Sequence, residues 1–123
     1  MIVGIGIDVL EHAEIDGLAG GWDNEFFRHT FSVAEQDEAR STANPLAYFA
    51  GRFCAKEALI KALDGWGESA RMRDIETVKG PSGAPHIHLI GELADVLPAE
   101  VRLHVSITHT RTSSTALVIA ERP

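Results

Sequence analysis

The sequence is short of cysteine, of long hydrophobic runs and of basic residues, and each shortage excludes a class of protein. Its single cysteine, Cys54, rules out an internal disulfide and a cysteine-based metal cluster, and it suits a reducing compartment such as the cytoplasm. No apolar run approaches the roughly 18 residues of a membrane span, and the first residues lack the basic start of a signal peptide. Against 18 acids stand 11 Lys and Arg, and the net charge of −7 argues against a general nucleic-acid surface.

The pattern of apolar residues predicts one α+β domain over residues 1–123. The longest predicted helix is Pro45–Leu63, which Asn44 can cap. Shorter helices are expected at 9–21, 23–30, 92–97 and from a capping box at Ser32–Glu35 to about residue 41. Strands are expected at Ile2–Asp8, 73–78, 85–90, 101–108 and 115–121. This order predicts a mainly antiparallel sheet packed on one long helix, with short helices around it.

The long helix carries one acid that its apolar face does not explain. At 100° per residue, one apolar face forms, which we expect to pack on the core, and it contains Leu46, Phe49, Ala50, Phe53 and Ile60. Glu57 falls inside this face, where a carboxylate needs a cation or hydrogen bonds, and Lys61 lies at its edge. Spacing alone favours an ion pair between Glu57 and Lys61 over a metal ligand.

A second carboxylate, Asp8, is expected at the last position of the first strand. Gly4 and Gly6 leave room in this strand for close approach of a backbone or a ligand. An aspartate at a strand end is most often a turn or cap residue. Beside Glu57, however, it would complete a pair of oxygen ligands with open positions, which Mg²⁺ prefers. Lys61 would then be a point charge for a phosphate.

The histidines and Cys54 give weaker signals. The alternation in 101–108 puts His104 on the polar side of a strand, where a histidine is usually solvated. His86 and His88 share a strand face but have no evident third ligand. Cys54 is interpreted as a small buried side chain. No dinucleotide fingerprint or nucleophile elbow is present.

Three segments together resemble the holo-acyl-carrier-protein synthase family of phosphopantetheinyl transferases. They are GIGIDVLE at 4–11, FAGRFCAKEALIKAL at 49–63 and HVSITHT at 104–110, in family order and at family-like distances. The similarity runs nearly end to end and includes the turn at Gly83–Pro85. It implies the phosphopantetheinyl transferase fold and a homotrimer with each site between neighbouring subunits.

The resemblance implies transfer of 4′-phosphopantetheine from coenzyme A to a serine of an apo carrier protein, with Mg²⁺ as cofactor and release of 3′,5′-ADP. Asp8 and Glu57 match the family's magnesium ligands and, with Lys61, form the implied catalytic set. Lys61 also matches the lysine that contacts the transferred phosphate or leaving group, and His104 a histidine at the CoA site. Arg52 is either structural or near the ligand. Either Glu57 or a metal-bound water could act as the base for the carrier serine. The carrier could belong to fatty-acid, polyketide or peptide synthesis.

Residues 11–30 depart from the family pattern, which has basic residues here to meet the acidic recognition helix of the carrier. Glu14 and Asp16 stand where positive charge is expected, and Arg28 is the only arginine. These acids would repel an acidic partner. We therefore predict a less acidic or specialised carrier, or a mainly apolar contact. Candidates for that contact are Leu18, Trp22 and Phe26.

Two other functions use the same residues. A metal-dependent hydrolase of CoA or nucleotides would need a further carboxylate to activate water, and none is well placed. A non-catalytic CoA-binding or assembly protein would follow from lost carrier recognition, but the intact Asp8, Glu57 and Lys61 argue against it.

Overall fold

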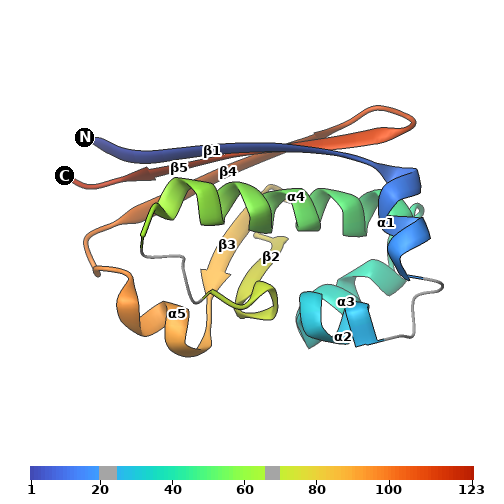
Figure 1. Ribbon diagram of the computed structural model, residues 1–123, viewed down its shortest axis with the longest axis horizontal. Helices are drawn as coiled ribbons and strands as arrows, with labels where there is room; N and C mark the ends of the chain where they lie inside the picture. Colours follow the sequence, from blue (N-terminus) through green and yellow to red (C-terminus); the bar gives the residue numbers. More distant parts are fainter. Residues whose placement is uncertain (20–24, 66–69) are drawn as a thin grey trace.

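The computed structural model describes residues 1–19, 25–65 and 70–123, and it has the predicted α+β architecture. An antiparallel sheet of order β1–β5–β4 forms the upper layer in Figure 1, with α4 directly beneath it. Its strands are β1 (Ile2–Glu11), β5 (Ser113–Glu121) and β4 (Arg102–His109). Helix α1 (His12–Ala19) lies beside the N-terminal end of α4 (Pro45–Leu63), and the other small elements lie on the side of α4 away from this sheet. These are α2 (Glu25–Thr30), α3 (Val33–Arg40), the 3-10 helix η1 (Met72–Asp74), β2 (Ile75–Lys79), β3 (Pro85–Leu89) and α5 (Gly91–Val96).

The bounds of α4 confirm the prediction, but only the edges of the expected core face are buried. Asn44 caps the helix by accepting a hydrogen bond from the Ala47 N–H at 3.2 Å. Of that face, Phe49 and Ala50 at its edges are buried, whereas Leu46, Phe53 and Ile60 are only half-buried. The other buried positions lie around the rest of the helix, and they include Cys54, Ala55, Ala58, Leu59, Ala62 and Leu63. Because α4 lies between the sheet and the lower layer, it is apolar on most of its circumference, and its large side chains do not mark the buried side.

Glycines let β1 lie directly against α4. A Cβ atom on Gly4 would collide with the carbonyl oxygen of Ala62, and one on Gly6 with that of Ala58. The two backbones are therefore in contact, as the prediction of a close approach at these glycines required. Any larger residue at either position would push the strand away from the helix.

The first strand is longer than predicted, which changes the position of Asp8. β1 pairs with β5 as far as Glu11 opposite Ser113, so the helix expected from residue 9 begins only at His12. Asp8 is therefore inside the strand, opposite Ala116, rather than at its end. Its neighbours on the same face of the strand, Gly6 and Leu10, are buried, so Asp8 faces α4.

The remaining boundaries differ from the predictions by one or two residues, and one short 3-10 helix was not predicted. The strand expected at 73–78 is preceded by η1 and begins at Ile75. β2 and β3 form the predicted hairpin, with Gly83 at φ 88° in its turn. In the described ranges, no helix combines the length and apolar character needed to cross a membrane.

A buried ion pair that the sequence analysis missed joins α3 to α4. Lys56 Nζ lies 2.7 Å from Glu35 Oε1, and both side chains are fully buried. Glu35 is also the predicted capping-box residue, since it accepts from the Ser32 N–H while its own N–H donates to Ser32 Oγ. The capping box is thus confirmed, but its carboxylate has a second role in the core.

Candidate active site

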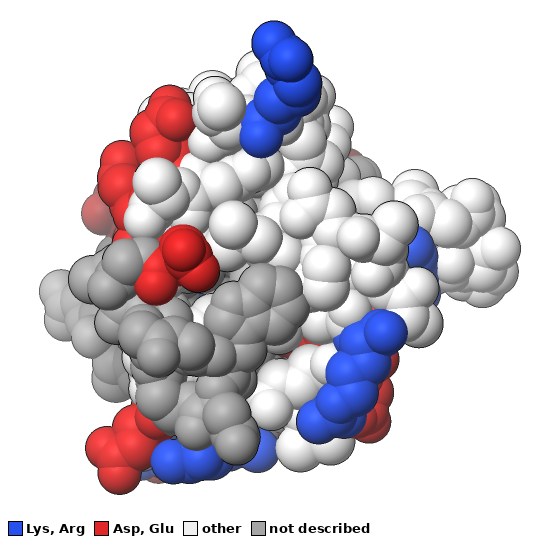
Figure 2. Space-filling model, turned by 90° about the vertical axis from the view of Figure 1, so that its right-hand side faces the viewer, with Lys and Arg blue, Asp and Glu red and all other residues white. Residues whose placement is uncertain are grey.

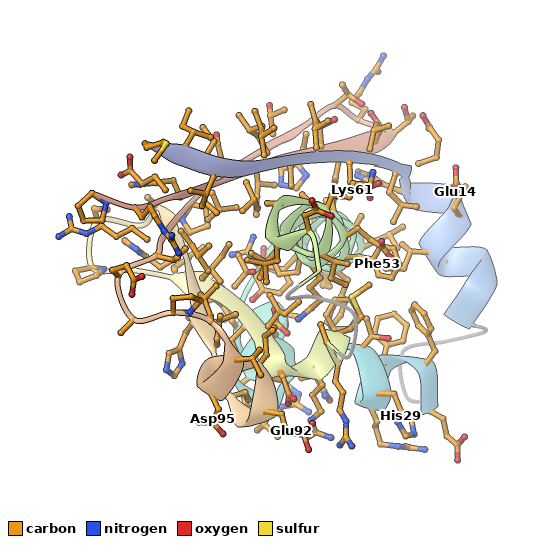
Figure 3. The ribbon with its side chains drawn as sticks, turned by 60° about the vertical axis from the view of Figure 1, so that its left-hand side comes forward. Glu14, His29, Phe53, Lys61, Glu92 and Asp95 are labelled. Atoms are coloured by element: carbon orange, nitrogen blue, oxygen red, sulfur yellow. The ribbon has the colours of Figure 1, made fainter. Side chains whose placement is uncertain are left out.

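The structure brings Asp8, Glu57 and Lys61 together where β1 crosses α4. Lys61 Nζ lies 3.2 Å from Asp8 Oδ1 and donates to the Ile7 carbonyl at 2.9 Å. The Lys61 side chain is 53% exposed and that of Asp8 is 21% exposed. The predicted ion pair between Glu57 and Lys61 is wrong, because the lysine reaches across to the strand instead. Figure 3 shows Lys61 on the side of α4 that faces β1.

Glu57 is half-buried next to this ion pair. Partial burial raises the pKa of its carboxyl above the ordinary value of 4.5, the negative charge of Asp8 raises it further, and Lys61 offsets part of the effect. Among the described residues, none forms a hydrogen bond or an ion pair with the Glu57 carboxylate. Two neighbouring carboxylates therefore share a single lysine, which leaves oxygen lone pairs available to a cation.

The thiol of Cys54 lies against the same two acids. Burial, followed by the charge of Asp8 and a hydrogen bond to it, raises the pKa of the Cys54 thiol to about 12. The Sγ atom also lies 3.4 Å from the Ser114 carbonyl oxygen. Cys54 thus stays protonated at neutral pH and acts as a donor, which agrees with its interpretation as an inert buried side chain.

The donor set fits a hard divalent cation with open coordination positions. In the part of the chain that the structure describes, no three His, Cys, Asp or Glu side chains group as metal ligands. Two carboxylates without a third protein ligand suit Mg²⁺, which keeps waters or substrate oxygens in its shell. Beside them opens a hollow of about 240 Å³, lined by Ile7, Asp8, Val9, Lys61 and Thr115.

His104 lies on the opposite face of the sheet from Asp8. It is paired in register with Ile119, which is paired with Ile5, and Ile5 is on the outer face. Its imidazole Nε2 lies 2.7 Å from Glu121 Oε1, and its side chain is 56% exposed. A pocket of about 160 Å³ beside it is lined by Pro85, His86, Ile87, Leu103, His104 and Val105. Within one chain, His104 is thus not brought together with Asp8, Glu57 and Lys61.

Arg52 is built into the interior and does not face Asp8. Its Nε donates to the Thr77 carbonyl at 3.0 Å, and its Nη2 lies 3.2 Å from Glu38 Oε1. Its guanidinium also stacks 4.1 Å from the centre of the Tyr48 ring. Nine positions separate Arg52 from Lys61, which puts them on opposite sides of the helix. Of the two roles left open for Arg52, these contacts favour the structural one over ligand binding.

A polar network under the β4–β5 hairpin was missed by the sequence analysis. The buried Ser114 hydroxyl lies 2.8 Å from His12 Nε2 and 2.6 Å from His109 Nδ1. Burial, followed by the proximity of His12 and Arg52, lowers the pKa of His109. His12 and Ser114 are 102 positions apart, so no local spacing could have revealed the contact.

Comparison with known proteins gives concordant matches along the whole chain. Residues 4–118 match the family model described as the 4′-phosphopantetheinyl transferase superfamily. The holo-[acyl-carrier-protein] synthase of Nitratidesulfovibrio vulgaris (strain DP4) is 43% identical over 98% of this chain and 99% of its own length. The acyl carrier protein synthase of Mycobacterium tuberculosis is 34% identical with a TM-score of 0.78 over all of both chains. The holo-(acyl-carrier-protein) synthase of Bacillus anthracis, solved in complex with CoA (3′,5′-ADP), is 31% identical with a TM-score of 0.81, covering 100% of this chain and 99% of that one.

Proposed function

Since this chain belongs to the 4′-phosphopantetheinyl transferase superfamily and is an enzyme of the holo-[acyl-carrier-protein] synthase type, we propose that it transfers 4′-phosphopantetheine from coenzyme A to a serine of an apo carrier protein, with Mg²⁺ as cofactor and 3′,5′-ADP as product. The observation that carries the proposal is the meeting of Asp8, Glu57 and Lys61 at one edge of the sheet. The expected compartment is the cytoplasm, which rests on composition alone.

In this reaction the serine oxygen forms a bond to the phosphorus that carries pantetheine, and the bond from that phosphorus to 3′,5′-ADP breaks. The phosphates are strongly anionic, so the protein must supply positive charge. Lys61 suits this role because its side chain is exposed and its ion pair with Asp8 is long. An exposed pair of this kind is worth at most about 1 kcal/mol, so Lys61 can turn to a phosphate at little cost.

Asp8 and Glu57 would hold the Mg²⁺ ion. When bound, the ion would neutralise charge on the pyrophosphate of coenzyme A. Burial, followed by the negative charge of Asp8, raises the pKa of the Glu57 carboxyl. The repulsion between the two acids supports this assignment, because a divalent cation between them would relieve it.

A homotrimer with shared sites would explain the position of His104. The outer face of the sheet carries Ile5, Ile7 and Val9, which are between 60% and 64% exposed. An exposed apolar surface of this kind is typical of a subunit interface. His104 projects from the same face, so an assembly that covers it would present His104 of one subunit to the coenzyme A site of its neighbour.

Mass spectrometry of the carrier tests the proposed transfer. Protein, coenzyme A, Mg²⁺ and an apo carrier are mixed, and the carrier is expected to gain the mass of phosphopantetheine. Coenzyme A breakdown without transfer would instead identify a hydrolase, and binding without either product a non-catalytic CoA-binding protein.

Subunit mixing tests the shared site. Asp8→Asn and His104→Ala proteins are each expected to be impaired, and subunit exchange between them should restore part of the activity. Sedimentation velocity gives the assembly size independently. A monomer with full activity would refute the trimer and leave the transfer reaction standing.

A further inference from the structure

The two acids of the candidate metal site already face a cation of the protein itself, the ammonium group of Lys61. Its Nζ donates to the Ile7 carbonyl at 2.9 Å and lies 3.2 Å from Asp8 Oδ1. Glu57 precedes Lys61 by one helical turn. Among the described residues, the charges that act on the Glu57 carboxyl are those of Asp8 and Lys61. One lysine therefore neutralises part of the negative charge of both acids.

The position of Lys61 follows from the contact between β1 and α4. A Cβ atom on Gly4 or Gly6 would collide with carbonyl groups of α4 that lie four residues apart. Two residues along the strand therefore match about four along the helix, in the opposite direction, which puts Asp8 near Cys54, whose thiol is hydrogen-bonded to it. Helical side chains lean towards the N-terminal end of their helix, so Lys61 extends back towards Asp8. The pair is set by backbone packing and is present before a ligand binds.

The ion pair is weak enough for a ligand to replace it. The Lys61 side chain is 53% exposed, and an exposed pair contributes little stability. Lys56 of the same helix is the opposite case, because its buried Nζ donates to Glu35 and to two backbone carbonyls. Of these two lysines, only Lys61 can leave its acid without losing a saturated set of hydrogen bonds.

The helix that follows β1 is acidic on its exposed side. Glu14 and Asp16 are exposed on α1, and its last turn contains no basic residue. Figure 2 shows acidic side chains mainly on the left of this end of the molecule, with Lys and Arg at its top, right and bottom. Of the apolar side chains considered for carrier contact, those of Leu18 and Trp22 lie outside the described residues. The described part of α1 therefore offers Asp8 no second cation.

Asp8 cannot serve both Lys61 and a metal ion equally well. Its Oδ1 atom accepts from Lys61 Nζ, and coordination of Mg²⁺ would use the same oxygen lone pairs. Two cations that share one carboxylate repel each other. The ammonium would therefore leave Asp8 when the metal site is filled. A hollow of about 240 Å³, which Lys61 itself lines, gives the released side chain space beside the site.

We propose that Lys61 is the counter-ion of the metal site in the free enzyme and that its release from Asp8 couples the binding of Mg²⁺ to that of the pyrophosphate of coenzyme A, an inference that rests on the proposed transfer function. Without coenzyme A, the displaced ammonium gains no new partner, so Mg²⁺ binds weakly. With coenzyme A, the ammonium gains a phosphate. Because coupling between two ligands is reciprocal, Mg²⁺ raises the affinity for coenzyme A by the same factor.

Calorimetric titration of Mg²⁺ into the protein without coenzyme A tests the counter-ion role. Lys61→Met removes the charge and keeps an unbranched side chain. It is expected to bind Mg²⁺ about fivefold more tightly than the wild type, because the competing ion pair is gone. Lys61→Arg keeps the cation and should bind Mg²⁺ as weakly as the wild type. The matched control is Lys79→Met, at the exposed end of β2, which should leave the Mg²⁺ affinity unchanged.

A second titration, with saturating coenzyme A and no carrier protein, measures the coupling. The factor by which coenzyme A lowers the dissociation constant of Mg²⁺ should be at least about fivefold smaller in Lys61→Met than in the wild type. The difference should come from tighter binding without coenzyme A. A lysine that only contacts a phosphate would leave that arm of the comparison unchanged.

The outcomes separate the inference from the function on which it rests. Equal dissociation constants of Mg²⁺ for the wild type and Lys61→Met without coenzyme A would overturn the counter-ion role. An equal gain of affinity in Lys79→Met would also overturn it, since general loss of positive charge would then be the cause. If Lys61→Met is misfolded, Lys61→Gln repeats the test. A wild-type protein that binds Mg²⁺ in this way and modifies no carrier would refute the transfer function and leave the counter-ion role standing.

Discussion

Helix α4 carries two lysines that each pair with an acid, and the two pairs have opposite character. Lys56 and Glu35 are both 0% exposed and lie 2.7 Å apart. Lys61 and Asp8 are 53% and 21% exposed and lie 3.2 Å apart, with Glu57 beside them. The same chemical pair is therefore sealed at one position and open to solvent at the other.

The two pairs differ in how fully their hydrogen bonds are used. Lys56 Nζ donates to Glu35, to the Met72 carbonyl and to the Ile75 carbonyl. The Glu35 carboxylate also accepts from the backbone N–H groups of Ser32 and Thr77. An ammonium with three acceptors has no donor left for a ligand. At Asp8 and Glu57, acceptors outnumber donors, which is what a cation or a phosphate-bound metal requires.

Removal of one open carboxylate should have the largest effect on activity. Glu57→Gln is expected to lower transfer at least about a thousandfold, because the site loses a metal ligand and half of its negative charge. Transfer is measured by the mass of the carrier at saturating coenzyme A. Asp8→Asn should behave in the same way.

The same variant should not unfold the protein. A carboxyl whose pKa is raised in the folded state contributes stability below its ordinary pKa of 4.5 and loses that contribution as pH rises. At pH 7, Glu57→Gln should therefore be neutral or slightly stabilising in a thermal melt. Millimolar Mg²⁺ should raise the melting temperature of the wild type more than that of the variant. Full activity in Glu57→Gln would remove Glu57 from the site.

Breaking the sealed pair should instead cost stability. Lys56→Met leaves the buried Glu35 carboxylate without its cation, which typically costs about 3–5 kcal/mol. Burial already raises the pKa of Glu35 and lowers that of Lys56, so burial disfavours the charged form of each group when its partner is absent. Urea denaturation at pH 7 measures the loss.

A double variant gives the control for this prediction. Glu35→Gln/Lys56→Met removes both charges and keeps an oxygen for the Ser32 and Thr77 N–H groups, so it should be more stable than Lys56→Met. If Lys56→Met were as stable as the wild type, the number of hydrogen bonds made by each pair would not explain the difference between Lys56–Glu35 and Lys61–Asp8.

The sequence predicted secondary-structure elements and close backbone contacts better than it predicted which side chains form ion pairs. The bounds of α4, the capping box at Ser32 and the backbone contact at Gly4 all follow from local rules, and the structure has them. The side of α4 that is most buried could not be predicted. Because the helix is buried on most sides, the positions of its large side chains do not indicate which side faces the core. Lys61 pairs with Asp8 rather than Glu57 because β1 lies in contact with the helix. This contact joins residues far apart in the sequence, so the spacing within the helix could not predict it.

Removing the open lysine should have an intermediate effect. Lys61→Ala is expected to lower kcat/KM for coenzyme A about tenfold to a hundredfold, because a positive charge near the phosphates is lost. The free energy of unfolding should change by less than about 1 kcal/mol, since the pair is exposed. Lys61→Arg keeps the charge and should retain more activity than Lys61→Ala. A large loss of stability in either variant would place Lys61 with Lys56 among the structural lysines.

The smallest predicted effect concerns His109. Its side chain is hydrogen-bonded to the buried Ser114 but, unlike Lys56 and Glu35, it is exposed at the surface. Burial, His12 and Arg52 lower the pKa of His109 below its ordinary value of 6.5. The unfolded chain therefore binds a proton there before the folded chain does, and stability should fall as pH drops below about 6.5. One such group contributes a slope of at most about 1.4 kcal/mol per pH unit. His109→Gln, which can still bond to Ser114, should flatten the loss of stability between pH 7 and pH 5, whereas His29→Gln on the exposed face of α2 should not. If the pH dependence of stability is the same in His109→Gln as in the wild type, the network around Ser114 tolerates a charged imidazole. Protonation of His109 would then not destabilise the fold.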